Sequence, residues 1–202
     1  MDADASDRLR EWISYPKNPL KPPFDAVGLD LRGADLSGGK FLESWFTSAT
    51  MTQMRLVEAD FHRSHFEQAD LSLANCTKAD FSKAVLDETN LQGACLDHAD
   101  LGRADISEVD ARSASFRCAD FSGAILIDAN FCGANLSNAV VQNTAFEVKM
   151  DENTIVLGLS GSIYGPVTFY ARGAASALNG TELEQFMNSR GANIEVLTPW
   201  SP

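Results

Sequence analysis

The stretch "ADFSKAVLDETNLQGACLDHADL", residues 79–101, repeats itself with a step that neither a helix nor a strand has. Ala79-Asp80-Phe81 returns twenty residues later as Ala99-Asp100-Leu101. Between the two copies an apolar residue recurs at every fifth position. The side chains of one helix face recur about every 3.6 residues, and those of one strand face about every 2. A step of five therefore requires another kind of structure.

The step of five extends far beyond this stretch. Counted outward from Phe81, the register holds from Leu31 to Phe146, which is 24 consecutive positions without an insertion or a deletion. The occupants are Leu, Phe, Met, Ile or Val, except for Cys76 and Ala111, and the position two residues earlier is mostly Ala. One large and one small apolar residue in every five is the packing pattern of a solenoid.

A second period of twenty lies above the first. Asp recurs at positions 60, 80, 100 and 120, and Phe recurs at 41, 61, 81 and 121. Because four units of five make twenty, we expect one turn of the solenoid to have four short sides. The residues expected to fill the core include Phe41, Phe61, Phe81, Leu86, Leu91, Leu96, Leu101 and Phe121.

The repeated units carry a family resemblance. "ADLSG" (34–38), "ADFSK" (79–83), "ANFCG" (129–133) and "ANLSN" (134–138) resemble the A(D/N)LxX repeat of the pentapeptide-repeat proteins. The resemblance covers about 116 of the 202 residues. It implies an all-β solenoid, a right-handed quadrilateral β-helix whose large apolar residue and small Ala both point inward. Twenty-four units would give about six coils, roughly 4.8 Å apart, and so a rod about 29 Å long.

Residues 1–28 are expected to form an N-terminal cap, because a solenoid must cover its open ends. Ser6 or Asp7 is a candidate N-cap of a short helix that carries Leu9, Trp12 and Ile13. The segment 15–24, "YPKNPLKPPF", is expected to be extended, since its prolines do not fit a helix.

The repeat domain is expected over residues 29–148, because Asp151 falls where the next core residue is due. Residues 149–202 read as a small α+β tail with strands at 154–161 and 162–172, a helix, and a last strand at 192–199. Thr181 is the expected cap of that helix, Glu184 its capping-box partner and Gly191 its stop. The tail covers the last coil, forms a dimer contact or binds a partner. The resemblance implies that a homodimer would use such a C-terminal element.

Composition narrows the function. No run of eighteen apolar residues exists, so we expect no membrane span, and the first ten residues do not have the pattern of a signal peptide. The cytoplasm is the expected location, where the four cysteines would stay reduced. A net charge of −12 argues against direct nucleic-acid binding, because phosphate contacts need Lys and Arg.

We find no constellation typical of an enzyme. His62, His65 and His98 have no paired acid at a catalytic spacing, and the first two lack a third ligand for a metal. "GLSGS" (158–162) lacks the last glycine of a nucleophile elbow and favours a hairpin turn. The sequence therefore predicts no catalytic residues, no cofactor and no metal.

The charge is unevenly distributed among the four expected sides. Residues 29–146 hold 17 acidic and nine basic residues. One side, built on Phe46, Phe66 and Leu86 and their later equivalents, holds six acids and no base: Glu67, Asp87, Glu88, Asp105, Glu108 and Asp128. The same side points Trp45, Val85, Ile125 and Ile127 outward. An acidic strip with apolar residues is typical of a recognition surface. The Asp ladder at 60, 80, 100 and 120 is either structural or part of recognition.

Two functions remain. The first is a non-enzymatic scaffold whose acidic face binds a specific protein partner, for example a cognate toxin or an assembly partner. The second is a DNA mimic that binds a type II topoisomerase, since six carboxylates over four coils match about six phosphates of one DNA strand. Some pentapeptide-repeat proteins bind DNA gyrase or topoisomerase IV and confer resistance to gyrase-targeting antibiotics. The unbroken register has no room for the loops of the looped quinolone-resistance type, which favours simple binding. A purely structural rod, or an enzyme in the tail, would account for the rest.

Overall fold

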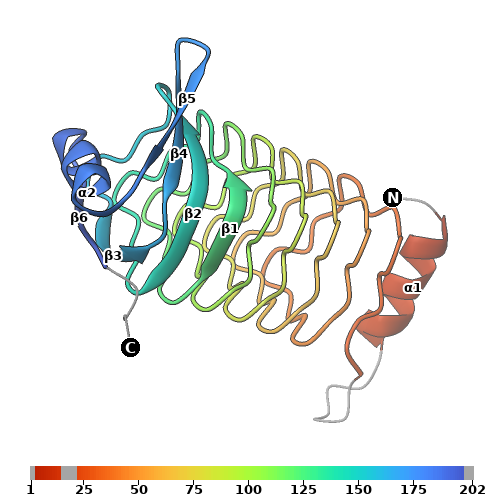
Figure 1. The fold of residues 1–202 in the computed structure, drawn as a ribbon. Helices are drawn as coiled ribbons and strands as arrows, with labels where there is room; N and C mark the ends of the chain where they lie inside the picture. Colours follow the sequence, from red (N-terminus) through yellow and green to blue (C-terminus); the bar gives the residue numbers. More distant parts are fainter. Residues whose placement is uncertain (1–2, 15–21, 198–202) are drawn as a thin grey trace.

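The computed structural model describes residues 3–14 and 22–197, which form a solenoid with a helix at each end (Figure 1). Helix α1 (Ala3–Ser14) lies at one end and α2 (Gly180–Ser189) at the other. The strands are β1 (Ile125–Asn130), β2 (Thr144–Asp151), β3 (Ser160–Tyr164), β4 (Val167–Ala171), β5 (Ala174–Leu178) and β6 (Asn193–Val196). Neither described helix is long and apolar enough to cross a membrane.

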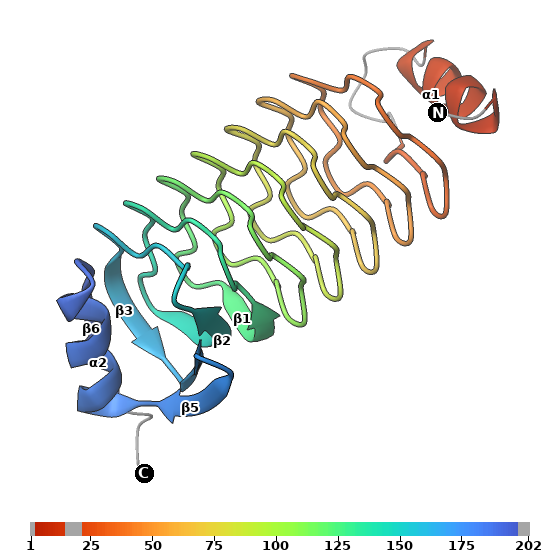
Figure 2. The same ribbon diagram turned by 90° about the horizontal axis from the view of Figure 1, so that it is seen from above.

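Most of the solenoid is held by single-residue parallel bridges. Each bridge joins a residue to the one twenty positions later, as in Asp60↔Asp80 and Asp80↔Asp100. A two-residue turn separates successive bridges along the chain. One coil therefore takes four units of five, and the coils stack along one axis (Figure 2). The chain forms a β-helix solenoid.

The core is a stack of apolar side chains inside the coils. The eight residues expected there are 0–3% exposed. The rings of Phe41, Phe61 and Phe81 lie one above another, with centroids 5.4 and 5.2 Å apart. The ring of Phe66 meets Phe61 edge to face at 5.1 Å. Like positions in successive coils thus pack on one another.

The corners of the coils impose an unusual backbone conformation. From Glu43 to Asn143 the second corner residue, where it is not glycine, has φ between 53° and 60°. Few side chains adopt this region without cost. A bond compensates: the Asp or Asn before each core residue accepts the N–H two positions later, as Asp80 does from Ser82 (2.8 Å). The Asp ladder makes this bond throughout, so it has a structural role.

Helix α1 covers the first coil. It begins at Ala3, so Ser6 and Asp7 lie inside it and neither is the N-cap that the sequence indicated. Leu9 is buried, and the indole of Trp12 stacks on Phe41 at 5.0 Å. The side chain of Ile13 and most of the segment expected to be extended, residues 15–21, lie outside the described residues.

The β-helix continues past residue 148, where we expected the repeat domain to end. Bridges join Asn135 to Ile155 and Val140 to Ser160. Asp151 does not interrupt the core, because a one-residue slip in the pairing of β1 with β2 places Met150 inside at 1% exposure. Residues 154–159 consequently form another corner, and the strand expected over 154–161 begins only at β3.

The tail completes a sheet with the order β5-β4-β2-β3-β6. Leu183 and Met187 of α2 are buried there. The N-cap of α2 is Asn179 instead of Thr181, and the carboxylate of Glu184 accepts the N–H of Val196 (3.0 Å) instead of forming a capping box. The helix ends at Ser189, just before Gly191, as expected.

Candidate functional site: an acidic face of the β-helix

The acidic face consists of ten residues on one side of the β-helix and on the corner that follows it. Bridges connect positions 45, 65, 85, 105 and 125 coil by coil, which aligns Trp45, Val85, Asp105 and Ile125 in one column with His65. The other members occupy the turns directly after this column: Glu67, Asp87, Glu88, Glu108, Ile127 and Asp128. The backbone thus brings together all ten residues that the sequence indicated.

The apolar members of the acidic face lie at its two ends. Trp45 is 42% exposed on an early coil, and Ile125 and Ile127 are 42% and 41% exposed on a late one. Val85, between them, is half-buried. Apolar side chains of this size gain free energy when a partner covers them. The acids therefore lie between two apolar patches.

The carboxylates are close enough to affect one another. Partial burial and the nearby charges of Asp105, Glu88 and Glu67 raise the pKa of Asp87 above its usual range. Like charges disfavour each other's ionised forms, and a cation that approached them would relieve this repulsion. The middle of the acidic face is thus a site of negative potential.

Glu67 is partly engaged within the molecule. Its Oε1 lies 2.9 Å from Nδ1 of His65, and its Oε2 accepts the hydroxyl of Thr47 at 2.9 Å. Burial tends to raise the pKa of Glu67, but the bonds from His65, the backbone and Thr47 outweigh it and lower the pKa. The expectation that no histidine has a paired acid is therefore wrong for His65.

One base lies on the acidic face, where the sequence showed none. Nζ of Lys149, in β2, is 3.7 Å from Oδ1 of Asp128 and donates to the carbonyl of Asp128 at 3.2 Å. The register slip between Ile127 and Ala129 brings the lysine there. No sequence signal marks a slip of one residue, so Lys149 was missed.

The remaining acids differ in how firmly they are held. Asp105 accepts both the N–H (3.1 Å) and the hydroxyl (2.6 Å) of Ser107, so it also fixes its turn. Glu88 accepts the amide of Gln68 at 3.0 Å. Within the described residues no hydrogen bond or ion pair holds Asp87 or Glu108. These two carboxylates are the most available to a partner.

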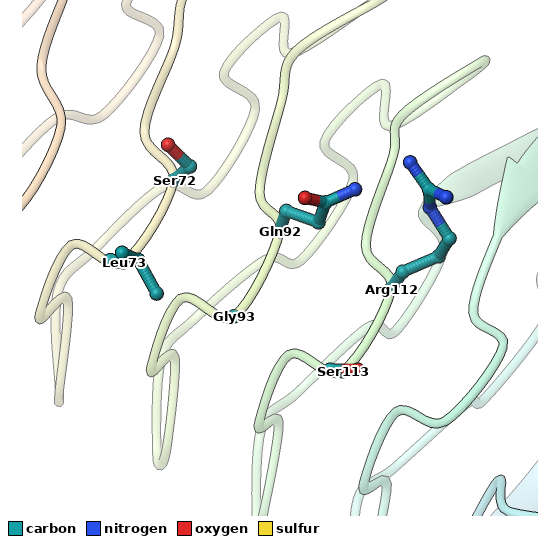
Figure 3. A pocket seen from close by; sticks show the side chains of 6 residues that line it. All are labelled: Ser72, Leu73, Gln92, Gly93, Arg112 and Ser113. Atoms are coloured by element: carbon teal, nitrogen blue, oxygen red, sulfur yellow. The ribbon is translucent and has the colours of Figure 1, made fainter.

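Other surfaces offer less. In the described part of the chain, no group of three His, Cys, Asp or Glu side chains is arranged to hold a metal ion. A shallow groove of about 450 Å³ lies on another corner, where Gly93 leaves room between Leu73 and Ser113 (Figure 3). The guanidinium of Arg112 at its rim is bonded to Asp110 (2.8 Å). The groove contains no residue of the acidic face.

The repeat identifies the family. The family model for pentapeptide repeats matches eight copies, over residues 55–93, 64–103, 85–117 and 114–147. The chain belongs to the pentapeptide-repeat family. This assignment agrees with the coil of four five-residue units. No curated protein sequence matches this pentapeptide-repeat protein.

Among solved structures, three pentapeptide-repeat relatives illustrate the range. QnrB1, a plasmid-mediated fluoroquinolone resistance protein, has a TM-score of 0.46 and 19% identity, over 67% of this chain and 77% of QnrB1. HetL from the cyanobacterium Nostoc sp. strain PCC 7120, involved in heterocyst differentiation regulation, has a TM-score of 0.38 and 18% identity over 95% of each chain. A thylakoid-lumen protein of Arabidopsis thaliana has a TM-score of 0.41 and 24% identity, over 60% of this chain and 71% of the other.

Proposed function

We propose that this pentapeptide-repeat protein is a non-enzymatic scaffold, acting in the cytoplasm, whose acidic face binds a basic surface of a specific protein partner. The observation that carries the proposal is the alignment of six carboxylates on one side and its corner, with apolar side chains at both ends. A partner that places Lys or Arg against Asp87 and Glu108 would gain from the unrelieved repulsion there. A cognate toxin or an assembly partner would fit this description.

The test compares two variants of equal charge. One carries Glu67→Gln, Asp87→Asn, Glu88→Gln and Asp105→Asn on the acidic face. The other carries Asp→Asn at 60, 80, 100 and 120, on the neighbouring side. Asn keeps the oxygen that accepts the turn N–H, so we expect both variants to fold. Each variant gains four charge units, so non-specific electrostatic effects are matched.

Immobilised wild type and both variants would be used to capture proteins from a lysate of the source organism. We expect the partner to be retained by the wild type and by the ladder variant, and lost by the acidic-face variant. Retention by the acidic-face variant would discard this face as the binding site. Equal loss from both variants would show an effect of net charge alone.

The second candidate is a DNA mimic that binds a type II topoisomerase. The spacing of the carboxylates favours it, because coils about 4.8 Å apart carry acids at a density close to that of one DNA strand. Supercoiling by purified DNA gyrase, with this protein titrated and relaxed plasmid varied, separates the two proposals. Inhibition that added plasmid relieves supports the mimic, and activity unchanged at micromolar protein supports the scaffold.

Two further features remain proposals. The family resemblance supports a right-handed winding of about six coils, which a crystal structure would test. It also supports a homodimer formed through the C-terminal tail, which sedimentation at several protein concentrations would test.

A further inference from the structure

The β4–β5 hairpin ends the sheet with an exposed strand. β5 is the terminal strand of the sheet and pairs only with β4, among the strands of the described residues. Ala174, Ala175, Ser176 and Ala177 are all exposed, and Leu178 alone is buried. Figure 1 shows the tip of the hairpin standing out from the coils. The outer edge of β5 is therefore accessible.

The hairpin register shows which backbone groups point outward. Arg172 and Gly173, both with positive φ, form the two-residue turn, and Ala171 pairs with Ala174 directly beside it. In such a hairpin the residues next to the turn bond across it, and the bonding direction then alternates. The N–H and C=O groups of Ala175 and Ala177 consequently point away from β4. The described part of the chain provides no hydrogen-bond partner for them.

This edge carries none of the usual protection against strand pairing. Natural edge strands are commonly blunted by a charged residue, a proline or a bulge. β5, with the sequence AASAL, has no charge and no proline, and its pairing with β4 is unbroken. In a chain with a net charge of −12, such a strand is a place where two copies can approach without direct repulsion.

We propose that β5 pairs antiparallel with β5 of a second copy, about a two-fold axis at Ser176. The outward groups are self-complementary in this register, because Ala175 of one copy faces Ala177 of the other and exchanges both hydrogen bonds with it. The same exchange occurs on the far side of the axis, which gives four bonds and a continuous sheet across the two molecules. The inference rests on the proposed homodimer and specifies the surface that forms it.

Charge complementarity supports this register. The pairing places the hairpin turn, with the exposed Arg172, beside the start of α2 of the second copy. The first turn of α2 carries the exposed Glu182. No ion pair of Arg172 is found within the described residues. The two-fold axis forms this contact twice, so the only charges near the edge attract across it.

A cysteine at the axis tests the register. Residues directly opposite in a non-hydrogen-bonded antiparallel pair have Cα atoms about 4.5 Å apart, within the range for a disulfide. Ser176→Cys should therefore form a covalent dimer under mild oxidation, visible on a non-reducing gel. Ala174→Cys is the matched control, because it lies off the axis in the same exposed strand. Both are made with Cys118→Ser, which removes the exposed native thiol.

Equilibrium sedimentation of the full chain tests the edge itself. Ala177→Pro removes an outward N–H and leaves the bonds to β4, so it should weaken the dimer at least tenfold. Arg172→Glu should also weaken it, and adding Glu182→Arg should restore it.

A dimer that withstands Ala177→Pro, without a cross-link through Ser176→Cys, would overturn the β5 interface while the homodimer stands. A wild type that stays monomeric at all concentrations, without that cross-link, would overturn both. Neither result bears on the acidic face, because its capture assay uses a different surface.

Discussion

Phe81 shows how a single residue supports the β-helix. Its side chain is fully buried, stacked on Phe61 and edge to face with Phe66. Phe81→Ala removes these contacts and leaves a cavity, so we expect a loss of about 3–5 kcal/mol in the free energy of unfolding. Leu73→Ala, at a site 60% exposed, should cost less than about 0.5 kcal/mol. Denaturant unfolding measures both, and similar losses would contradict the inward packing of Phe81.

Asp97 is the most buried carboxylate with an ion pair, and its stability contribution should depend on pH. Its side chain is 8% exposed, and Nε of Arg117 donates to it at 2.8 Å. Burial tends to raise the pKa of Asp97, but the bonds from Arg117 and Ser115 outweigh it and lower the pKa. Because the folded pKa is depressed, this contribution is present above the unfolded pKa, about 3.9, and is lost as pH falls through the folded value.

We expect Arg117→Ala to lower the free energy of unfolding by roughly 1–3 kcal/mol at pH 7, since it leaves a buried carboxylate short of a partner. The difference from the wild type should shrink below about pH 4, as Asp97 becomes protonated. Arg112→Ala is the control, because its partner Asp110 is 34% exposed and the loss should stay below about 1 kcal/mol. A loss for Arg117→Ala that is independent of pH would contradict the role of this pair.

The helix α2 is the element that closes the C-terminal end. Arg190, just after it, donates to the carbonyls of Glu152 and Thr154 (both 3.0 Å) and lies over the rings of Phe169 and Phe186. We expect Arg190→Ala to cost about 1–2 kcal/mol, from hydrogen bonds and ring contacts together. Amide exchange should quicken in α2 and β6 and stay unchanged in the central coils. Arg103→Ala, on an exposed corner, should leave both regions unaffected.

The sequence predicts the regular element well and the irregular one less well. The five-residue period specifies which side chains point inward, because every unit meets the same environment. The tail has no such period. Thr181 matches a capping box by its spacing, yet Glu184 bonds Val196 instead, since the fold brings β6 within reach. Asp151 looks like the end of the register, but the slip beside Ile127 moves Met150 inward.

At the scale of the whole molecule, the acidic face could be predicted because a period of twenty converts sequence positions into columns. What could not be predicted were contacts that depend on side-chain reach or on a slip, such as His65 with Glu67 and Lys149 with Asp128. These contacts reduce the available charge at both ends of the acidic face and leave Asp87 and Glu108 in its middle.

The period also allows the acidic face to be cut in two without disturbing the core. Repeating residues 94–98 once inserts one unit, which should move Asp105, Glu108 and Asp128 to the next side while Glu67, Asp87 and Glu88 stay. We expect this variant to fold, by circular dichroism, and to lose its partner in the capture assay. Repeating residues 79–98 inserts a whole coil and should keep the partner. Capture by both variants would mean that the partner does not need the columns aligned.

The bridges between residues twenty apart have a consequence for how such a chain can change length. An added or deleted segment of twenty residues alters the height of the molecule by about 4.8 Å and leaves every column where it was. A segment of five residues keeps the height nearly constant and turns everything beyond it by a quarter revolution. Duplications within this gene would therefore produce either longer copies of the same surface or twisted versions of it, and selection could act on height and on angle separately.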